Sequence, residues 1–142
     1  MDLSIKLENT TLYIRVAALV KGNNGYLFEK HKDGYIFAVG GKIMLNESSE
    51  QAIKRELKEE LDFDTDNFKL LSVIENFYIK ETGEKVHEIC FVYEVEEVFV
   101  EVVPSEFVEV DLGDIKNHNI KPTQLIDLIF NEKKVFRHIV LK

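Results

Sequence analysis

Apolar residues fall along this chain in short runs that predict β-strands separated by sharp turns. Leu12–Lys21 and Tyr26–His31 lie on either side of Gly22-Asn23-Asn24-Gly25, a combination typical of a β-hairpin. A third predicted strand, Tyr35–Val39, follows the turn at Asp33-Gly34. The N-terminal part of the chain is therefore expected to contribute three consecutive strands.

Beyond these strands, the pattern predicts a helix, more strands and a second helix. Two long β-rich runs, Lys69–Lys80 and Val86–Val95, flank a turn at Thr82-Gly83. The other predicted elements are, in chain order, short strands at Phe99–Val103 and Phe107–Val110, a helix that begins at Pro122 and buries Leu125, Ile126 and Ile129, and a closing strand at Val135–Leu141. Since no repeat or linker interrupts this order, residues 1–142 are expected to form a single α/β domain, with a mixed sheet between helices.

The first predicted helix carries an unusual cluster of acids. It is expected to begin just after Ser48, which forms a capping-box pattern with Gln51. At about 100° per residue, Glu56, Glu59 and Glu60 fall on one face. Beside them runs an apolar stripe of Ile53, Leu57 and Leu61. The acids are therefore expected to lie at the edge of the buried face.

Three clustered carboxylates point to a bound cation. Glu56 is three and four residues from Glu59 and Glu60, and each like-charge contact costs about 0.2–0.5 kcal/mol. Arg55 is expected to face too far round the helix to neutralise all three acids. Oxygen-only ligands favour Mg²⁺ or Mn²⁺ over zinc, which prefers Cys and His. The alternative is an ordinary solvated helix face, which is common in Glu- and Lys-rich helices.

The segment before the helix adds to this pattern. Gly40-Gly41 ends an apolar run and allows close approach to the backbone. Five residues separate Gly41 from Glu47, and seven separate Glu47 from Arg55-Glu56-Leu57. One residue later comes the pair Glu59-Glu60. The stretch from Gly41 to Phe63 therefore resembles the box of the Nudix hydrolases. Asp62 stands where that family has Gly, and Val39 stands where many members have Pro; Asp62 is expected to adopt the left-handed conformation of the glycine at modest cost.

The resemblance implies both a fold and a reaction. The implied fold is an α/β/α sandwich with a mixed sheet. The implied reaction is Mg²⁺-dependent hydrolysis, by water, of the diphosphate linkage in a nucleoside diphosphate derivative: a nucleoside triphosphate, a damaged nucleotide or a nucleotide sugar. The resemblance also assigns metal binding to the carbonyl of Gly40 and the carboxylates of Glu56, Glu59 and Glu60. Among these acids, Glu56 is the usual candidate for helping to activate water.

Supporting roles are implied for residues around this set. Arg55 and Glu47 would brace the loop against the helix and so orient the metal ligands. One further carboxylate can come from a later loop; Glu106 is the first candidate and Glu101 the second. The alternative for both acids is a solvated position in the loop.

Substrate contacts are less well defined by the sequence. Arg15, isolated in an apolar strand, could meet a phosphate or pair with an acid. Gly41 and the aromatic residues Phe37 and Tyr78 are further candidates, although strand aromatics often belong to the core. The four histidines lack ligand spacing, and Cys90 is expected to be a small core residue.

Composition narrows the class of partner. A formal net charge of −8 argues against a nucleic-acid duplex, whereas small phosphorylated substrates can be received by a metal. The single cysteine fits a reducing cytoplasm, and no apolar run is long enough to predict a signal peptide or a membrane span. A homodimer is possible. The second functional hypothesis is a catalytically weak Nudix-fold module that senses a nucleotide-like metabolite. The complete acid set favours the enzyme, whereas the replacement of the family glycine by Asp62 keeps the sensor hypothesis open.

Overall fold

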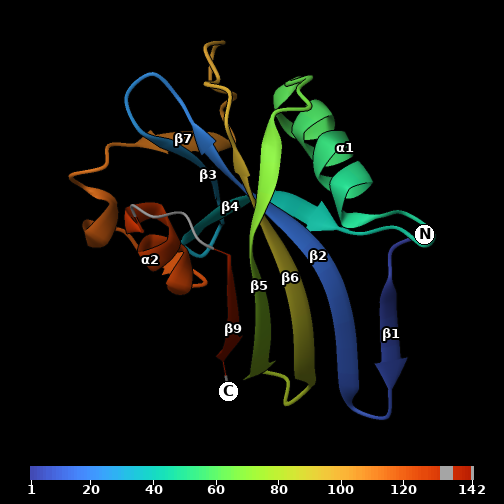
Figure 1. The fold of residues 1–142 in the computed structure, drawn as a ribbon. Helices are drawn as coiled ribbons and strands as arrows, with labels where there is room; N and C mark the ends of the chain where they lie inside the picture. Colours follow the sequence, from blue (N-terminus) through green and yellow to red (C-terminus); the bar gives the residue numbers. More distant parts are fainter. Residues whose placement is uncertain (132–135, 142) are drawn as a thin grey trace.

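The computed structural model describes residues 1–131 and 136–141, which form one mixed sheet between two helices. Its strands are β1 (Ser4–Leu7), β2 (Thr10–Lys21), β3 (Tyr26–Lys30), β4 (Ile36–Lys42), β5 (Phe68–Ile79), β6 (Lys85–Val95), β7 (Phe107–Val110), β8 (Ile120–Lys121) and β9 (Arg137–Leu141). The main sheet order is β7-β3-β4-β2-β6-β5-β9, with β1 beside β2 and β8 beside β4. The helices α1 (Ser49–Leu61) and α2 (Gln124–Phe130) lie on either side of the sheet (Figure 1).

Alternation along β2 divides the core into two layers. Ala17 and Leu19 pack into the cluster that includes the buried residues of α2, whereas Val16 and Ala18 pack into the cluster that includes α1. Successive side chains of a strand point to opposite faces, so one strand serves both layers. This arrangement confirms the expected α/β/α sandwich. Within the described residues, no helix is long and apolar enough to cross a membrane.

The first helix has the ends that the sequence predicts. The backbone N–H of Gln51 donates to the Ser48 hydroxyl (3.1 Å), and the Ser48 N–H donates to the Gln51 side chain (2.9 Å), which completes the capping box. At the other end, Asp62 is left-handed (φ 52°, ψ 34°), as the family glycine implied. Lys58 Nζ contacts the Asp62 carboxylate at 2.7 Å. The helix ends there because its last carbonyls are capped by the Asp62 N–H.

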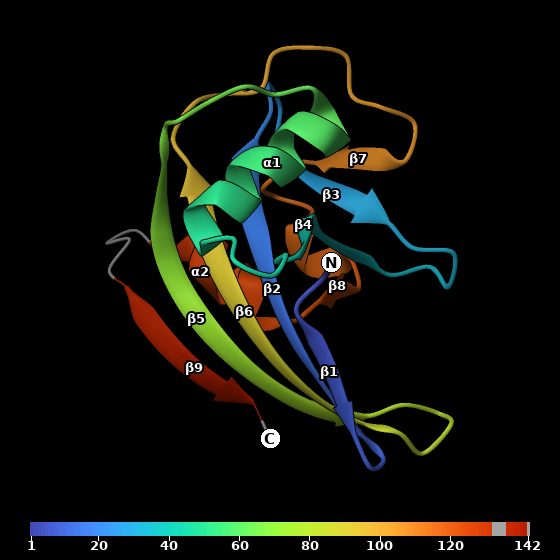
Figure 2. The ribbon, with the colours of Figure 1, turned by 90° about the vertical axis from the view of Figure 1, so that its right-hand side faces the viewer.

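One predicted strand is absent from the structure. Residues 99–103 form no strand; they lie in the loop between β6 and β7, which Figure 2 shows passing beyond the end of α1. Phe99 anchors this loop: its ring packs edge-on against Phe63, and its N–H donates to the Lys21 carbonyl (2.8 Å). The alternation that resembled a strand reflects one buried anchor between the exposed valines Val98 and Val100.

The second helix and the chain ends also depart from expectation. Helix α2 begins at Gln124 rather than Pro122, because the Leu125 N–H bonds only three residues back, to the Pro122 carbonyl, in a turn that precedes the helix. Leu125 and Ile129 are buried as expected, but Ile126 is only partly buried. The final strand begins at Arg137; Val135 lies outside the described residues. The exposed strand β1 and the short strand β8 were not predicted.

The left-handed residue at the end of α1 gives a stability prediction. Asp62→Gly and Asp62→Ala both lose the contact with Lys58, but only the alanine keeps the steric cost of the left-handed conformation. The glycine variant should therefore melt about 1–4 °C above the alanine variant in thermal unfolding. Equal melting temperatures would show that positive φ costs nothing at this position.

Candidate active site

Two adjacent glycines of β4 bring the backbone close to its neighbours in two different ways. A Cβ on Gly40 would lie 2.0 Å from the Val16 carbonyl oxygen of the paired strand β2. A Cβ on Gly41 would lie 2.3 Å from the carboxylate of Glu56, on the buried side of α1. Gly40 is thus required for strand packing, whereas Gly41 makes room for the carboxylate.

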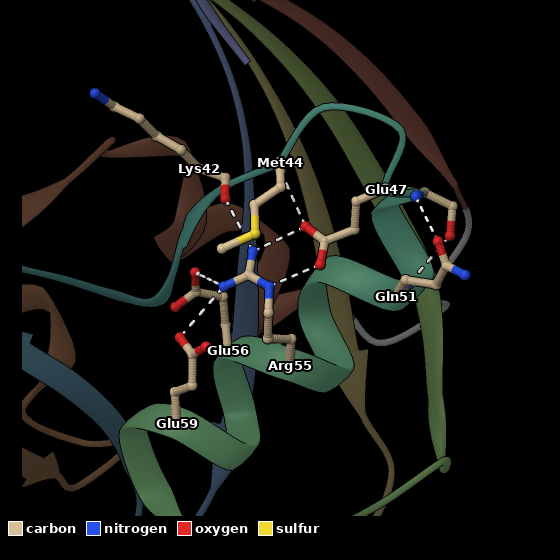
Figure 3. Close-up of polar contacts among 8 residues, drawn as sticks. Lys42, Met44, Glu47, Gln51, Arg55, Glu56 and Glu59 are labelled. Carbon is tan, nitrogen blue, oxygen red and sulfur yellow. Dashed lines mark hydrogen bonds and ion pairs between the residues drawn. The ribbon is translucent and has the colours of Figure 1, made fainter. Parts of the chain in front are cut away.

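Arg55 ties α1 to the loop before it (Figure 3). Its Nε and Nη2 donate to the two carboxylate oxygens of Glu47 at 2.7 and 2.8 Å, and Nη2 also donates to the Lys42 carbonyl at 3.1 Å. The hydrogen bond from Arg55 lowers the pKa of Glu47, and the same contact raises the pKa of Arg55. This two-point ion pair lies where the resemblance implied a brace; its importance for catalysis stays a prediction.

The remaining Arg55 nitrogen contacts two of the three acids. Nη1 donates to Glu56 at 2.8 Å and to Glu59 at 3.2 Å, so these two acids have a basic partner that the helical-wheel angle did not indicate. The long side chain carries its guanidinium well away from its own Cα direction, but it does not reach all three acids, as expected. Glu60 alone of the three acids has no basic partner among the described residues.

Carboxylates from two other segments, Glu29 of β3 and Glu106 of the loop before β7, act on Glu60 together with the acids of α1. Burial raises the pKa of Glu60, and repulsion from Glu59 and Glu106 raises it further. Burial likewise raises the pKa of Glu29, and the charge of Glu60 adds to this. Burial also raises the pKa of Glu56, against the opposing effect of Arg55. The prediction of a bound cation rests on this concentration of acids in one region.

Glu29 was missed from the sequence, and Glu106 fits its expected place. Glu29 lies on β3, paired with Phe37 of β4 and Phe107 of β7, so only the sheet register brings it to α1. A charged residue directly after a buried Phe28 was the available signal. Glu106 lies just before β7 and acts on both Glu29 and Glu60, whereas Glu101 is exposed further back in the same loop.

The donor chemistry of this region fits a hard divalent cation. All candidate side-chain ligands are carboxylates, and the missing Cβ of Gly41 leaves the Glu56 oxygens against the β4 backbone. Within the described residues, no three acidic, His or Cys side chains are already grouped closely enough to hold a metal. Arg55 Nη1 contacts both Glu56 and Glu59, so a cation would share or replace that contact. Metal binding by Gly40, Glu56, Glu59 and Glu60 stays a prediction.

A cavity of about 780 Å³ opens on the face of the sheet that α2 partly covers. Three of the predicted substrate residues, Arg15, Phe37 and Tyr78, line it, whereas Gly41 is absent from its lining. Arg15 Nη1 lies 3.8 Å from Glu88, so Arg15 pairs with an acid here, and its contact with a phosphate stays a prediction. Burial raises the pKa of Cys90 to about 12, which keeps this thiol protonated, as expected of a core residue.

The mixed sheet between two helices, with an acidic first helix tied by an Arg–Glu pair to the preceding loop, defines a domain of the Nudix type, a class of hydrolases that act on small phosphorylated substrates. The description "NUDIX domain" belongs to the family model that matches residues 13–136, so the chain belongs to this family. Membership confirms the resemblance and the enzyme class that it implied.

Solved structures share the fold at low sequence identity. The chain is similar to a MutT protein from Bacillus halodurans (TM-score 0.69, 18% identity, 89% of each chain) and to one from Methanosarcina mazei (0.65, 22%, 86% of this chain and 92% of the other). An ADP-ribose pyrophosphatase from Streptococcus suis aligns with a TM-score of 0.58 at 14% identity, over 89% of this chain and 98% of the other. No curated protein sequence matches the chain.

The two glycines predict different effects of the same substitution. Gly40→Ala places a methyl group against the β2 backbone, which cannot move without breaking strand pairing, and should lower the free energy of unfolding by about 1–3 kcal/mol. Gly41→Ala meets only the flexible end of Glu56 and should cost less than about 1 kcal/mol. Urea unfolding in chelator measures both. A larger loss for Gly41→Ala than for Gly40→Ala would contradict these assignments.

Proposed function

We propose that the protein is a Mg²⁺-dependent hydrolase that cleaves the diphosphate linkage of a nucleoside diphosphate derivative by attack of water, with Mn²⁺ as a possible substitute. The observation that supports this most directly is the convergence of Glu29, Glu56 and Glu106 on Glu60, which has no basic partner among the described residues. Such repulsion weakens a fold and is relieved by a divalent cation. Family membership supports the reaction class.

Each group has a distinct task in this proposal. Bound Mg²⁺ would polarise the phosphoryl oxygens and ease the deprotonation of water. Glu60 supplies the uncompensated negative charge that retains the cation. Glu56, whose pKa is raised by burial against the opposing effect of Arg55, is the candidate to accept a proton from the attacking water. Arg55 and Glu47 hold the helix and the loop in a fixed relation while charge changes around them.

The cavity supplies the place for the group attached to the diphosphate. Arg15 lines the cavity, and its charge partly offsets the rise that burial and Glu60 cause in the pKa of Glu29 in the acid cluster. A ligand bound in the cavity can therefore extend its phosphates past Arg15 toward the carboxylates. Nucleoside triphosphates, damaged nucleotides and nucleotide sugars all have this shape: a bulky group at one end and a diphosphate at the other.

The sensor hypothesis loses the feature that favoured it. Asp62 adopts the left-handed conformation of the family glycine, so this replacement leaves the end of α1 intact. The enzyme and the sensor are distinguished by a panel of nucleotides with Mg²⁺, in which release of phosphate or monophosphate is measured. A cytoplasmic location and a homodimer stay predictions.

Removal of one acid should separate catalysis from folding. Glu60→Gln should lower kcat at least a hundredfold on the best panel substrate, because the variant loses the charge with no basic partner, and wild-type turnover should require Mg²⁺ or Mn²⁺. Glu50→Gln, in the exposed first turn of the same helix, is the matched control and should retain full activity. Wild-type turnover by Glu60→Gln would remove Glu60 from the metal site.

The same variant should reverse its effect on stability when metal is added. In chelator, Glu60→Gln relieves the repulsion from Glu56 one turn away and should raise the free energy of unfolding by about 0.2–0.5 kcal/mol or more. In millimolar Mg²⁺ the wild type should gain stability through binding, and the variant should gain less. Glu56→Gln, which loses a contact with Arg55, should bring no such gain in chelator. Melts that Mg²⁺ leaves unchanged would count against a cation site.

A further inference from the structure

Glu88 is a buried carboxylate that the reaction chemistry does not use. It lies on β6 in the lining of the cavity, with only 8% of its surface exposed. The Arg15 guanidinium stands 3.8 Å away, beyond hydrogen-bonding distance, and Glu88 makes no hydrogen bond with any other described residue. Burial raises the pKa of Glu88, and the charge of Arg15 opposes this rise. Since buried carboxylates are normally satisfied by several donors, both Glu88 oxygens are available to a ligand.

The cavity beside Glu88 has room for a heterocycle and a second polar side chain to bind it. Asn76, which is directly opposite Glu88 in the pairing of β5 with β6, also lines the cavity and has no side-chain hydrogen bond in the described part of the chain. Small residues of three central strands, Ala17, Ala38 and Cys90, leave the space open. The volume of about 780 Å³ is within the range of pockets that enclose small ligands.

Part of the cavity lining is aromatic and cationic. The rings of His31 and Tyr35 stack at 4.2 Å, and Phe37 meets the His31 ring edge-on. Lys121 Nζ lies 4.4 Å over the Tyr35 ring. Aromatic rings favour a planar base, and Lys121 together with Arg15 favours a phosphorylated ligand in a chain whose net charge is −8.

We propose that this cavity binds a nucleobase that presents two adjacent N–H donors, the guanine edge, and that Glu88 is the residue that recognises it. A carboxylate has two parallel acceptor oxygens, and guanine places a ring N–H beside an exocyclic amine. Adenine places its amine beside an acceptor nitrogen, which the Glu88 oxygens would repel. The nearby Arg15 charge favours the ionised carboxylate that this pairing needs.

The position of Glu88 relative to the acid cluster fits this orientation. Phe37 lines the cavity and is the strand partner of Glu29, so the aromatic part of the lining lies next to one acid of the cluster. With its base on Glu88, a nucleotide would extend past Arg15 with its phosphates on the side of Glu29 and Glu60. This recognition role rests on the proposed hydrolysis for its biological purpose, but base binding does not depend on turnover.

Base recognition can be measured without metal or catalysis. Titration calorimetry in chelator with the monophosphates of guanosine, inosine and adenosine compares three edges; inosine lacks only the exocyclic amine. The wild type should bind the guanosine nucleotide about 10–100-fold more tightly than either of the others, because each leaves a Glu88 oxygen unpaired. Glu88→Gln should abolish this preference, while Glu81→Gln, in the exposed turn before β6, should preserve it.

The outcomes separate recognition from hydrolysis. Equal binding of guanosine and inosine monophosphates by the wild type, tighter binding of the adenosine nucleotide, or an unchanged preference in Glu88→Gln would each overturn the role of Glu88, even if the enzyme hydrolyses nucleotides. A Glu88-dependent guanine preference without any turnover would support the recognition site and reject the hydrolase. Should Glu88→Gln fail to fold in a thermal melt, equal binding of guanosine and inosine monophosphates by the wild type still overturns the proposal, and tighter binding of the guanosine nucleotide supports the guanine edge.

Discussion

The packing of α1 against the end of β4 is the constraint on which the acidic region depends. Ile53 and Leu57 of α1 are fully buried against the sheet. This packing holds the neighbouring Glu56 carboxylate against the Gly41 backbone. An acid in such a place loses much of its hydration, which the fold tolerates because Arg55 donates to it. Burial of the apolar face of α1 therefore fixes the positions of its carboxylates, and these positions determine whether a cation can bind.

A single guanidinium divides the acidic region into two parts. Arg55 donates to both oxygens of Glu47 and to the Lys42 carbonyl, and it contacts Glu56 and Glu59 with its remaining nitrogen, so its donors are all used by acceptors before and at the start of this part of α1. Glu60 lies beyond this reach and faces acids from other segments. One part of the region is thus held rigid by pairing, and the other part keeps an excess of negative charge that a mobile ion can meet.

Local sequence signals predicted the local structure well. The capping box at Ser48 and the left-handed Asp62 depend on a few neighbouring residues, and both could be inferred without the fold. Glu29 and Glu88 could not, because each becomes significant only through strand pairing with distant segments. The contacts of Arg55 were missed for a different reason: a long side chain chooses its partners by reach, which the angular position of its Cα does not specify. Phe99 shows the converse error, in which an apolar residue that anchors a loop produces a strand-like pattern.

The alternation along β2 places two kinds of task on opposite sides of one strand. Arg15 and Ala17 border the cavity, while the intervening Val16 and the following Ala18 pack beneath α1. Substitutions on the cavity side can reshape what the protein admits without disturbing the layer that supports the acidic helix. Ligand preference can therefore change during evolution while the acidic side stays the same, because consecutive residues of one strand belong to different faces of the sheet.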